Sequence, residues 1–402
     1  MNRSNNSSKE NIIFPNYKKS IVNLASTILQ TYNVKPFHPV LTNIDVEKLK
    51  AKQNIVLIIL DGLGYNLLLQ CAQDSAKFMF SHLEDKLTSV FPSTTSAAIT
   101  SLLTGRTPWE HGAIGWTLYF KEFAKNIDFL PNWDSITGSK QDAKKYNLSD
   151  YLGAENIFEL INFKSPDTAL YAITMKKISK SLYSIKDSGS TSIIPYKKTK
   201  HLFRNIKKTI LKNKNRKKFI YAYSSSPDKL EHLFGTDSKK VKKYISNVDR
   251  LLEKFAEQLK GTNTTIFVTA DHGLLDIQQY HYVNEDKELF DCLYMPTFPE
   301  PRFISFFVKP HKMDKFKEVI KKYKDDYIFL TRQEFIAKGY LGNGIMHPKI
   351  DDFLGDYLAI AISTAAMKSI YMQNGKWKKE FLAHHAGLTE DEMLIPLIKI
   401  DL

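Results

Sequence analysis

The chain has 402 residues, of which 43% are apolar and 12% aromatic, and its formal net charge is +14 at pH 7. This apolar content excludes a disordered chain and is enough to bury a large core, in one large α/β domain or, by length alone, in two or three domains. The positive charge favours polyanionic partners such as nucleotides, nucleic acid or acidic lipid headgroups, unless it is a general property of the composition without a function.

The cysteines and the apolar runs indicate the compartment. Cys71 and Cys292 are far apart and lie in no Cys/His cluster, so neither a disulfide framework nor a thiolate metal site is predicted. The first 20 residues lack the apolar stretch of a secretory signal, and no run approaches the roughly 18 apolar residues of a membrane span. We expect a soluble, cytoplasmic protein with a flexible tail at residues 1–20 and one folded domain at 21–402.

Three short apolar runs are typical of buried parallel strands: residues 54–60, 219–223 and 265–270. Between them lie helical patterns at 96–104, closed by Gly105, and at 241–259. Because strands and helices alternate, the predicted fold class is α/β, with a central, mostly parallel sheet sandwiched by helices.

Two segments differ in composition from the rest. About half of residues 197–218 are Lys or Arg, while Leu202, Ile206 and Ile210 recur at helical spacing, so we predict a basic amphipathic helix. Its basic side is either a solvated helix face or a contact for nucleic acid or membrane. Residues 278–343 are rich in proline and aromatic residues, and we interpret them as an insertion that caps a site.

Two of the predicted strands lead directly into a carboxylate and a glycine. Asp61-Gly62 follows the first strand, and Asp271-His272-Gly273 follows the third. Side chains at the carboxyl ends of parallel strands project into the crevice where α/β folds place ligands. Adjacent Asp and His side chains can both reach one metal there if the chain leaves extended geometry, which glycine permits.

Four hydroxyl residues, Ser93, Thr94, Thr95 and Ser96, come directly before a helix of small residues. A hydroxyl at this place lies beside free backbone N–H groups and the positive end of a helix dipole, where a phosphate is stabilised. Simple capping of the helix is the alternative, since Ser and Thr favour that position in any protein.

Further candidate ligands follow the second strand and lie near the C-terminus. Asp228 and His232 are four residues apart and share a face if the segment turns into a helix, whereas Glu231 points elsewhere. Either His384 or His385 can complete a metal site with them, and spacing alone does not separate the two. Oxygen and imidazole ligands without thiolates suit zinc, with manganese as the alternative.

Five motifs occur in one order: Asp61-Gly62, a threonine ahead of TG-x-x-P-x-x-HG at 104–112, Asp228-x-x-x-His232, ADHG at 270–273, and His385-x-Gly-Leu-Thr. In this order the chain resembles the nucleotide pyrophosphatase/phosphodiesterase family of the alkaline phosphatase superfamily, over about residues 54–398. The resemblance implies an alkaline-phosphatase-like catalytic domain. It also implies a hydrolase acting on phosphoric ester bonds.

The resemblance assigns roles to individual residues. In the family the nucleophilic threonine stands nine residues before the threonine of the TG pair, so Thr95 is the counterpart here and Thr94 the alternative. Two divalent metal ions are implied, zinc or alternatively manganese. One is assigned Asp61, Thr95, Asp271 and His272, and the other Asp228, His232 and His385. His385 is preferred to His384 because Gly-Leu-Thr follows it at the family spacing.

Trp116 departs from the family pattern, because diesterases of this type place there an asparagine that binds a phosphoryl oxygen. Stabilisation of that oxygen is then left to the metals, to backbone N–H groups or to another residue. The departure also makes Trp116 a candidate for stacking on a base or lining the pocket.

The predicted mechanism is in-line attack by the Thr95 oxygen on phosphorus, followed by hydrolysis of the phospho-threonine by water. The expected substrate is a small phosphate ester, in the first place a nucleotide, without a stable nucleic-acid complex. A phosphomonoesterase or phosphosugar mutase of the same superfamily is the alternative. A sulfatase is disfavoured because no Cys or Ser stands in a Cys/Ser-x-Pro-x-Arg context. A basic nucleic-acid-binding protein without turnover is the alternative of another class.

Overall fold

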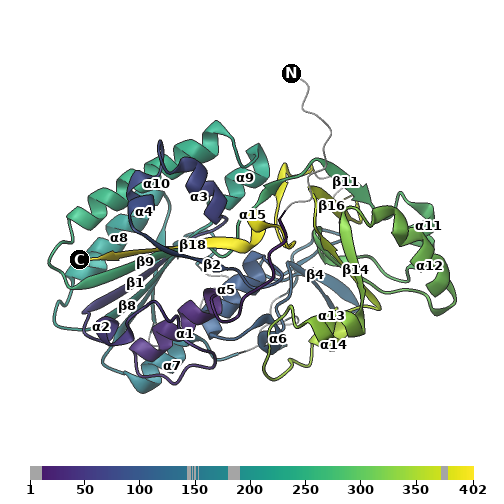
Figure 1. The fold of residues 1–402 in the computed structure, drawn as a ribbon. Helices are drawn as coiled ribbons and strands as arrows, with labels where there is room; N and C mark the ends of the chain where they lie inside the picture. The colour runs from purple at the N-terminus through teal and green to yellow at the C-terminus, as the bar shows by residue number, and fades with distance from the viewer. Residues whose placement is uncertain are drawn as a thin grey trace.

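The computed structural model describes residues 11–142, 146, 148, 151–152, 154–179, 191–372 and 379–402. Its main element is a seven-stranded sheet (Figure 1) made of β1 (Asn54–Leu60), β2 (Leu83–Thr88), β6 (Ala169–Met175), β7 (Thr191–Tyr196), β8 (Lys218–Ser224), β9 (Thr264–Thr269) and β18 (Leu394–Asp401). The strand order is β2–β18–β9–β1–β8–β6–β7. The strands from β9 to β7 run parallel, whereas β18 is antiparallel to both of its neighbours.

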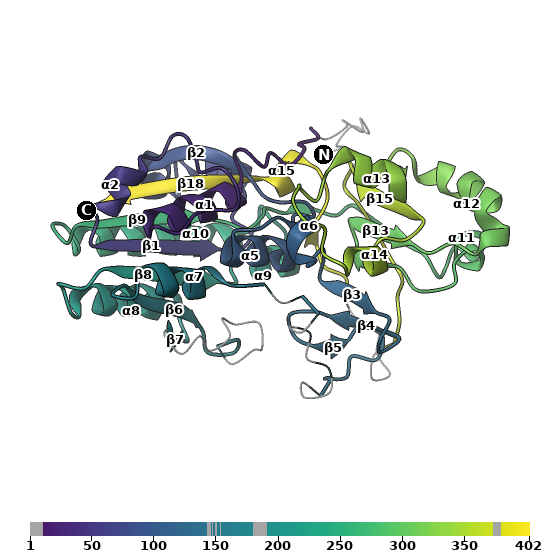
Figure 2. The same ribbon diagram turned by 90° about the horizontal axis from the view of Figure 1, so that it is seen from below.

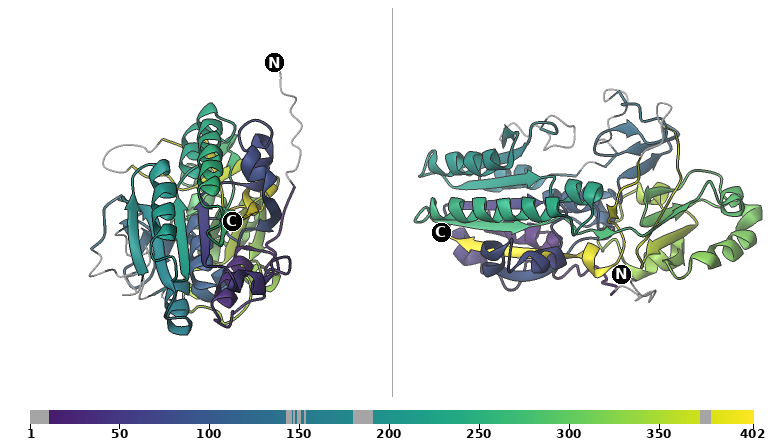
Figure 3. Two further views of the ribbon diagram at one scale, coloured as in Figure 1. Left: turned by 90° about the vertical axis from the view of Figure 1, so that its left-hand side faces the viewer. Right: turned by 90° about the horizontal axis from the view of Figure 1, so that it is seen from above.

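Helices cover both faces of this sheet (Figures 1 and 3). One group contains α1 (Ile21–Thr31), α2 (Val46–Lys50), α5 (Thr95–Thr104) and α7 (Ile157–Lys164). The other contains α3 (Tyr65–Cys71), α4 (Lys77–Ser81), α8 (Thr199–Leu211), α9 (Asp228–Phe234) and α10 (Lys239–Glu257). The predicted mostly parallel sheet sandwiched by helices is therefore confirmed.

The three strands predicted from apolar runs are β1, β8 and β9, and each lies within one residue of its predicted bounds. Every residue of these strands is buried, because they are central strands with helices on both faces. They are direct neighbours in the order β9–β1–β8, with β1 in the middle. The residues that follow the three strands therefore meet at one edge of the sheet.

The basic segment at 197–218 forms a shorter helix than predicted. Leu202, Ile206 and Ile210 of α8 are buried, as expected from their spacing. Lys218, however, is the first residue of β8 and is fully buried, with its Nζ donating to two backbone carbonyl oxygens at 3.0 Å. The end of the basic run thus belongs to the sheet, because the chain must turn after α8 to enter β8.

A second lobe, residues 279–368, lies beyond the carboxyl edge of the large sheet (Figure 2). Its four-stranded sheet has the order β12–β13–β15–β14. The elements of the lobe are β11 (Gln279–Tyr282), α11 (Lys287–Cys292), β12 (Phe298–Glu300), β13 (Phe303–Phe306), η2 (Pro310–Lys312), α12 (Met313–Ile320), η3 (Lys321–Tyr323), β14 (Tyr327–Thr331), α13 (Arg332–Lys338), α14 (Ile350–Phe353), β15 (Tyr357–Ala361) and β16 (Ala365–Lys368).

The second lobe extends past residue 343, where the predicted insertion ends. The strand β15 pairs with both β13 and β14, so the small sheet is incomplete without residues 357–361. A further three-stranded sheet packs against β12 and consists of β3 (Thr117–Phe120), β4 (Lys125–Asp128) and β5 (Trp133–Asp134). The remaining elements are α6 (Pro108–His111), β10 (Leu275–Asp276), β17 (Ala383–His384) and α15 (Glu390–Met393).

Of the predicted N-terminal tail, residues 1–10 lie outside the described residues. Residues 11–20 are placed against the body of the protein: the backbone N–H of Ile13 donates to Leu388 at 2.8 Å, and Ser20 is buried at the start of α1. In the part of the chain that the structure describes, no helix combines the length and the apolar character that a bilayer crossing requires.

Candidate active site

Three carboxylates, two of them buried and that of Asp228 half-buried, meet at the carboxyl edge of the large sheet. Asp61 directly follows β1, Asp271 lies two residues after β9, and Asp228 begins α9, four residues after β8. The backbone N–H of Asp228 donates to the carbonyl of Asp61 at 2.8 Å, and the N–H of Gly62 donates to Asp271 Oδ1 at 3.2 Å. The sequence-predicted carboxylates are thus held together by the backbone that follows their strands.

The two glycines after these carboxylates permit close approach of the chain. Gly62 has φ +81°, and a Cβ there would lie 2.7 Å from the Cα of Asp228. Gly273 is needed for a different reason from the one expected: its φ is not positive, but a Cβ there would lie 2.1 Å from the carbonyl oxygen of Asp391. A side chain at either position would push a neighbouring segment of the site away.

The imidazole of His272 is the centre of the first group of side chains. Its Nε2 lies 3.1 Å from Thr95 Oγ1, 3.4 Å from Asp271 Oδ2 and 3.6 Å from Asp61 Oδ1. Its Nδ1 faces the carbonyl oxygen of Gly273 at 3.2 Å. A proton on Nδ1 leaves the Nε2 lone pair directed at the hydroxyl and the two carboxylates.

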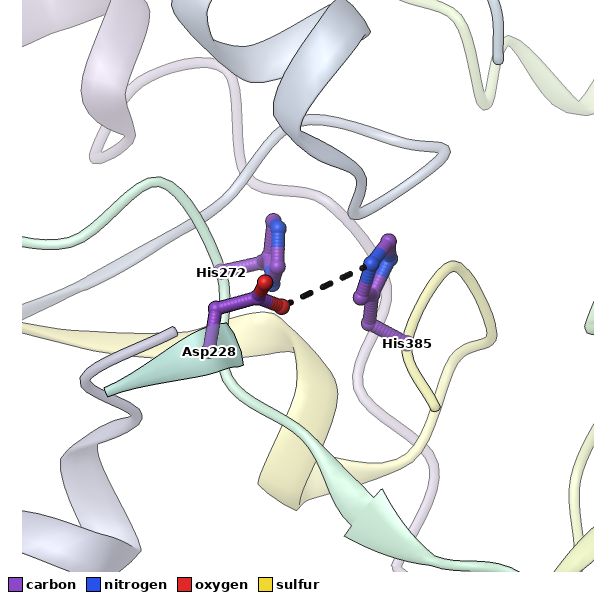
Figure 4. A group of neighbouring side chains, drawn as sticks. All are labelled: Asp228, His272 and His385. Atoms are coloured by element: carbon purple, nitrogen blue, oxygen red, sulfur yellow. Dashed lines mark ion pairs between the residues drawn. The ribbon is translucent and has the colours of Figure 1, made fainter. Parts of the chain in front are cut away.

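The second group is centred on the carboxylate of Asp228. Its Oδ1 lies 3.1 Å from His232 Nε2 and 3.8 Å from His385 Nε2. Figure 4 shows the side chains of Asp228, His272 and His385 together, with the ion pair between Asp228 and His385. His232 Nδ1 donates to the carbonyl oxygen of Ala383 at 2.6 Å, and its Nε2 is the ring nitrogen that faces Asp228.

The structure distinguishes between the two adjacent hydroxyls. Thr95 is the first residue of α5, and its hydroxyl contacts His272. The hydroxyl of Thr94 instead donates to Glu300 Oε1 at 2.6 Å. Of the two threonines, Thr95 is therefore the one whose oxygen faces the cluster of carboxylates and imidazoles.

The cluster crowds carboxylates together and disfavours protonation of His385, as expected of side chains that bind cations. Burial raises the pKa of Asp61 well above its ordinary value, and the charges of Asp271 and Asp228 raise it further. Burial also opposes ionisation of Asp228, but His232 outweighs it and lowers the pKa of that carboxyl. Burial and the neighbouring His272 hold the pKa of His385 well below its ordinary value. A divalent cation reverses the penalty on crowded carboxylates and favours neutral imidazoles.

The donor set fits two metal ions. Asp61, Asp271 and His272 bring ligand atoms within 4.8 Å of one another, and so do Asp228, His272 and His385. Within the described residues, Asp61 Oδ1 and Asp271 Oδ2 have no hydrogen-bond partner although both are buried. Buried carboxylate oxygens without donors are costly unless a cation pairs with them. His232, His384 and Glu231 belong to neither group, but His232 Nε2 lies 3.1 Å from Asp228 Oδ1.

Two features around the site carried no signal in the sequence: the partner of Asp61 and the burial of Glu231. The hydroxyl of Tyr223 donates to Asp61 Oδ2, a contact made possible by the pairing of β8 with β1. Glu231 on α9 is fully buried, and neither of its carboxylate oxygens has a partner among the described residues. Burial, and then the charge of Asp228, raise its pKa well above the ordinary value. Neither the contact between Tyr223 and Asp61 nor the burial of Glu231 could be deduced from residue spacing.

Trp116 lies just before β3, with its side chain 38% exposed. Its backbone N–H donates to Glu300 Oε1 at 2.6 Å, the same oxygen that accepts from Thr94. This places the backbone of Trp116 beside the N-terminus of α5. Burial raises the pKa of Glu300 to about 7, against the effect of these two donors.

A hydroxyl facing buried carboxylates and imidazoles, at the carboxyl edge of a mostly parallel sheet, defines a hydrolase of the alkaline phosphatase type. Residues 55–350 match the family described as type I phosphodiesterase / nucleotide pyrophosphatase, and the chain belongs to this family. It is thus an enzyme of the class that hydrolyses phosphoric ester bonds. Among curated proteins, none matches the sequence of the chain.

Solved structures with the same fold include murine ectonucleotide pyrophosphatase/phosphodiesterase 5, with a TM-score of 0.60 and 15% identity over 86% of this chain and 87% of that one. An inactive variant of that murine protein in complex with AMP has a TM-score of 0.60 and 16% identity over the same shares. Phosphonoacetate hydrolase from Sinorhizobium meliloti, in complex with phosphonoformate, has a TM-score of 0.61 and 18% identity over 87% and 90% of the two chains.

Proposed function

We propose that this enzyme is a two-metal phosphodiesterase that acts on nucleotide-like esters through a phospho-threonine on Thr95. The observation that carries the proposal is the contact of Thr95 Oγ1 with His272 Nε2 at 3.1 Å, beside the buried carboxylates of Asp61 and Asp271. A hydroxyl in such a place serves as a nucleophile rather than as a helix cap. The metals are expected to be zinc, with manganese as the alternative.

In the proposed reaction, the Thr95 oxygen forms a bond to phosphorus while the bond from phosphorus to the leaving oxygen breaks. Water then attacks the same phosphorus from the side that the leaving group vacated and releases Thr95. Asp61, Thr95, Asp271 and His272 would hold one cation, and Asp228, His232 and His385 the other. When bound, the cations would favour loss of the hydroxyl proton and neutralise charge on the phosphoryl oxygens.

The chain's own groups orient these parts. Tyr223 holds one oxygen of Asp61, and the carbonyl oxygens of Gly273 and Ala383 fix the rings of His272 and His232. Such partners around ligands set ring orientation and ligand basicity. The structure of the murine relative with AMP supports a nucleotide as substrate, and so does the family description.

The deciding assay compares a diester with a monoester. The purified protein is analysed for bound metal and assayed with bis(p-nitrophenyl) phosphate and p-nitrophenyl phosphate, with and without EDTA. We expect at least about tenfold higher kcat/KM for the diester, loss of activity in EDTA, and recovery with zinc or manganese. A preference for the monoester would support the phosphomonoesterase or mutase alternative. Trp116, in place of the asparagine that diesterases of the family have, favours that alternative. Salt-dependent binding of nucleic acid without turnover would contradict both.

A second prediction separates the two adjacent histidines. His385→Gln is expected to lower zinc affinity at the second site by more than about 100-fold, the upper end for loss of a residue that only supports a ligand, because His385 Nε2 faces Asp228 and is a proposed ligand itself. His384→Gln is the matched control and is expected to retain both zinc ions, since Asp228 forms ion pairs with His232 and His385 and none with His384 among the described residues. Zinc content after dialysis against a graded chelator series measures both. Equal zinc loss in the two variants would remove His385 from the proposed ligand set.

A further inference from the structure

We propose that Glu300 is a positioning residue that keeps the N-terminus of α5 open for a phosphoryl oxygen, an inference that rests on the proposed function. Glu300 is the last residue of β12 in the second lobe and is 7% exposed. With one oxygen, Oε1, it accepts from the Thr94 hydroxyl and from the Trp116 backbone N–H, each at 2.6 Å. The second lobe thereby reaches the residue next to Thr95.

Thr94 occupies the N-cap position of α5, with φ −137° and ψ 149°. In this conformation a threonine hydroxyl normally accepts from the backbone N–H two or three residues later and so caps the helix. Here the hydroxyl donates to Glu300, and no side chain caps α5. Among the described residues, the N–H groups of Thr95, Ser96 and Ala97 have no acceptor.

Uncapped N–H groups at the start of a ten-residue helix form an anion site with the help of the helix dipole. At α5 they surround Thr95, the residue that would attack the phosphorus. The Trp116 N–H cannot serve in their place, since Glu300 already holds it. Besides the cations, the donors that remain here for the phosphoryl oxygen, in place of the family asparagine, are those of α5.

A carboxylate is a stronger acceptor than a backbone group and holds the Thr94 hydroxyl away from the helix. Without Glu300, the hydroxyl would be released to cap Ser96 or Ala97 and would compete with substrate for the same N–H groups. The loss caused by removing Glu300 should therefore depend on the Thr94 hydroxyl.

The test is a double-mutant cycle of Glu300→Ala and Thr94→Val, where valine keeps the shape of threonine without its hydroxyl. The readouts are kcat/KM for bis(p-nitrophenyl) phosphate in the zinc-loaded enzyme and the affinity for inorganic phosphate by calorimetry. Glu334→Ala is the matched control, because Glu334 also accepts from a threonine hydroxyl and a backbone N–H, but at the start of α13 on the surface. Zinc content is measured for every variant.

Glu300→Ala is expected to lose about 100-fold in kcat/KM and in phosphate affinity, the lower end of the range for one oxyanion donor, with zinc content unchanged. Thr94→Val alone is expected to stay within about threefold of the unmodified protein, and the double variant within about fivefold of Thr94→Val. Glu334→Ala should match the unmodified protein. A double variant as impaired as Glu300→Ala, or a Glu300→Ala variant without loss, would overturn the inference.

Two further variants keep the outcome interpretable. Glu300→Gln retains an oxygen acceptor and replaces Glu300→Ala if that variant fails to fold. Any loss of kcat/KM or phosphate affinity in Glu300→Gln must then be recovered by adding Thr94→Val. If unmodified protein and Thr95→Ala hydrolyse the diester equally, the proposed function fails. Phosphate affinity then still decides whether Glu300 keeps α5 open, so the two failures are distinguishable.

Discussion

Thr95→Ala is expected to lower kcat toward bis(p-nitrophenyl) phosphate by about 10⁴-fold or more, because the attacking oxygen is removed. Among the described residues the hydroxyl has one hydrogen-bond partner, His272, and alanine fits the same helical position at the start of α5. Zinc content and the unfolding midpoint are therefore expected to stay close to those of the unmodified protein. Steady-state kinetics, metal analysis and thermal unfolding on the same preparations measure these three quantities.

Two neighbouring variants give the prediction its controls. Thr95→Ser retains a hydroxyl and is expected to keep measurable turnover. Thr94→Val removes the adjacent hydroxyl, which donates to Glu300 and does not face the metal ligands, so turnover should persist. Near-normal rates in Thr95→Ala would exclude it as the nucleophile, and an inactive Thr94→Val with an active Thr95→Ala would exchange the two assignments.

The strand ends of the site could be predicted because they depend on local sequence alone. A short apolar run that is buried on both faces has no polar face to show, so β1 could be recognised from its composition, and Asp61 then follows at its end. The same holds for β9 and Asp271. Since carboxyl ends of parallel strands meet at one edge, these residues were expected to converge, and the structure brings them together.

Contacts between segments far apart in the sequence could not be predicted in this way. The hydroxyl of Thr94 differs from that of Thr95 because it donates to Glu300, more than two hundred residues later. The carboxylate of Asp61 is oriented by Tyr223 on the next strand. Neither partner stands at a diagnostic spacing. Likewise, the second lobe extends past residue 343, the predicted end of the insertion, because β15 enters its sheet between β13 and β14, which come earlier in the chain.

A buried ion pair ties the second lobe to the loop that carries His385. Arg302 and Glu392 are both fully buried and pair through two hydrogen bonds, Nε to Oε1 at 2.6 Å and Nη2 to Oε2 at 2.8 Å. Glu392 also accepts from the backbone N–H of Gly387 at 2.7 Å and from the hydroxyl of Thr389 at 2.7 Å. One carboxylate thus fastens both Arg302, in the β12–β13 turn, and the residues directly after His385.

Arg302→Met is expected to reduce the free energy of unfolding by about 3–5 kcal/mol, because it leaves Glu392 buried without its counter-charge. Glu392→Gln should lose a similar amount, and the double variant less than the sum, since neither charge then remains unpaired. Guanidinium unfolding measures the cycle. Lys315→Met, in the exposed pair with Glu288, is the control and should lose little stability, because water screens that pair. Additive losses would show that Arg302 and Glu392 stabilise the protein independently. If Arg302→Met retains its zinc affinity, the ion pair does not control the position of His385.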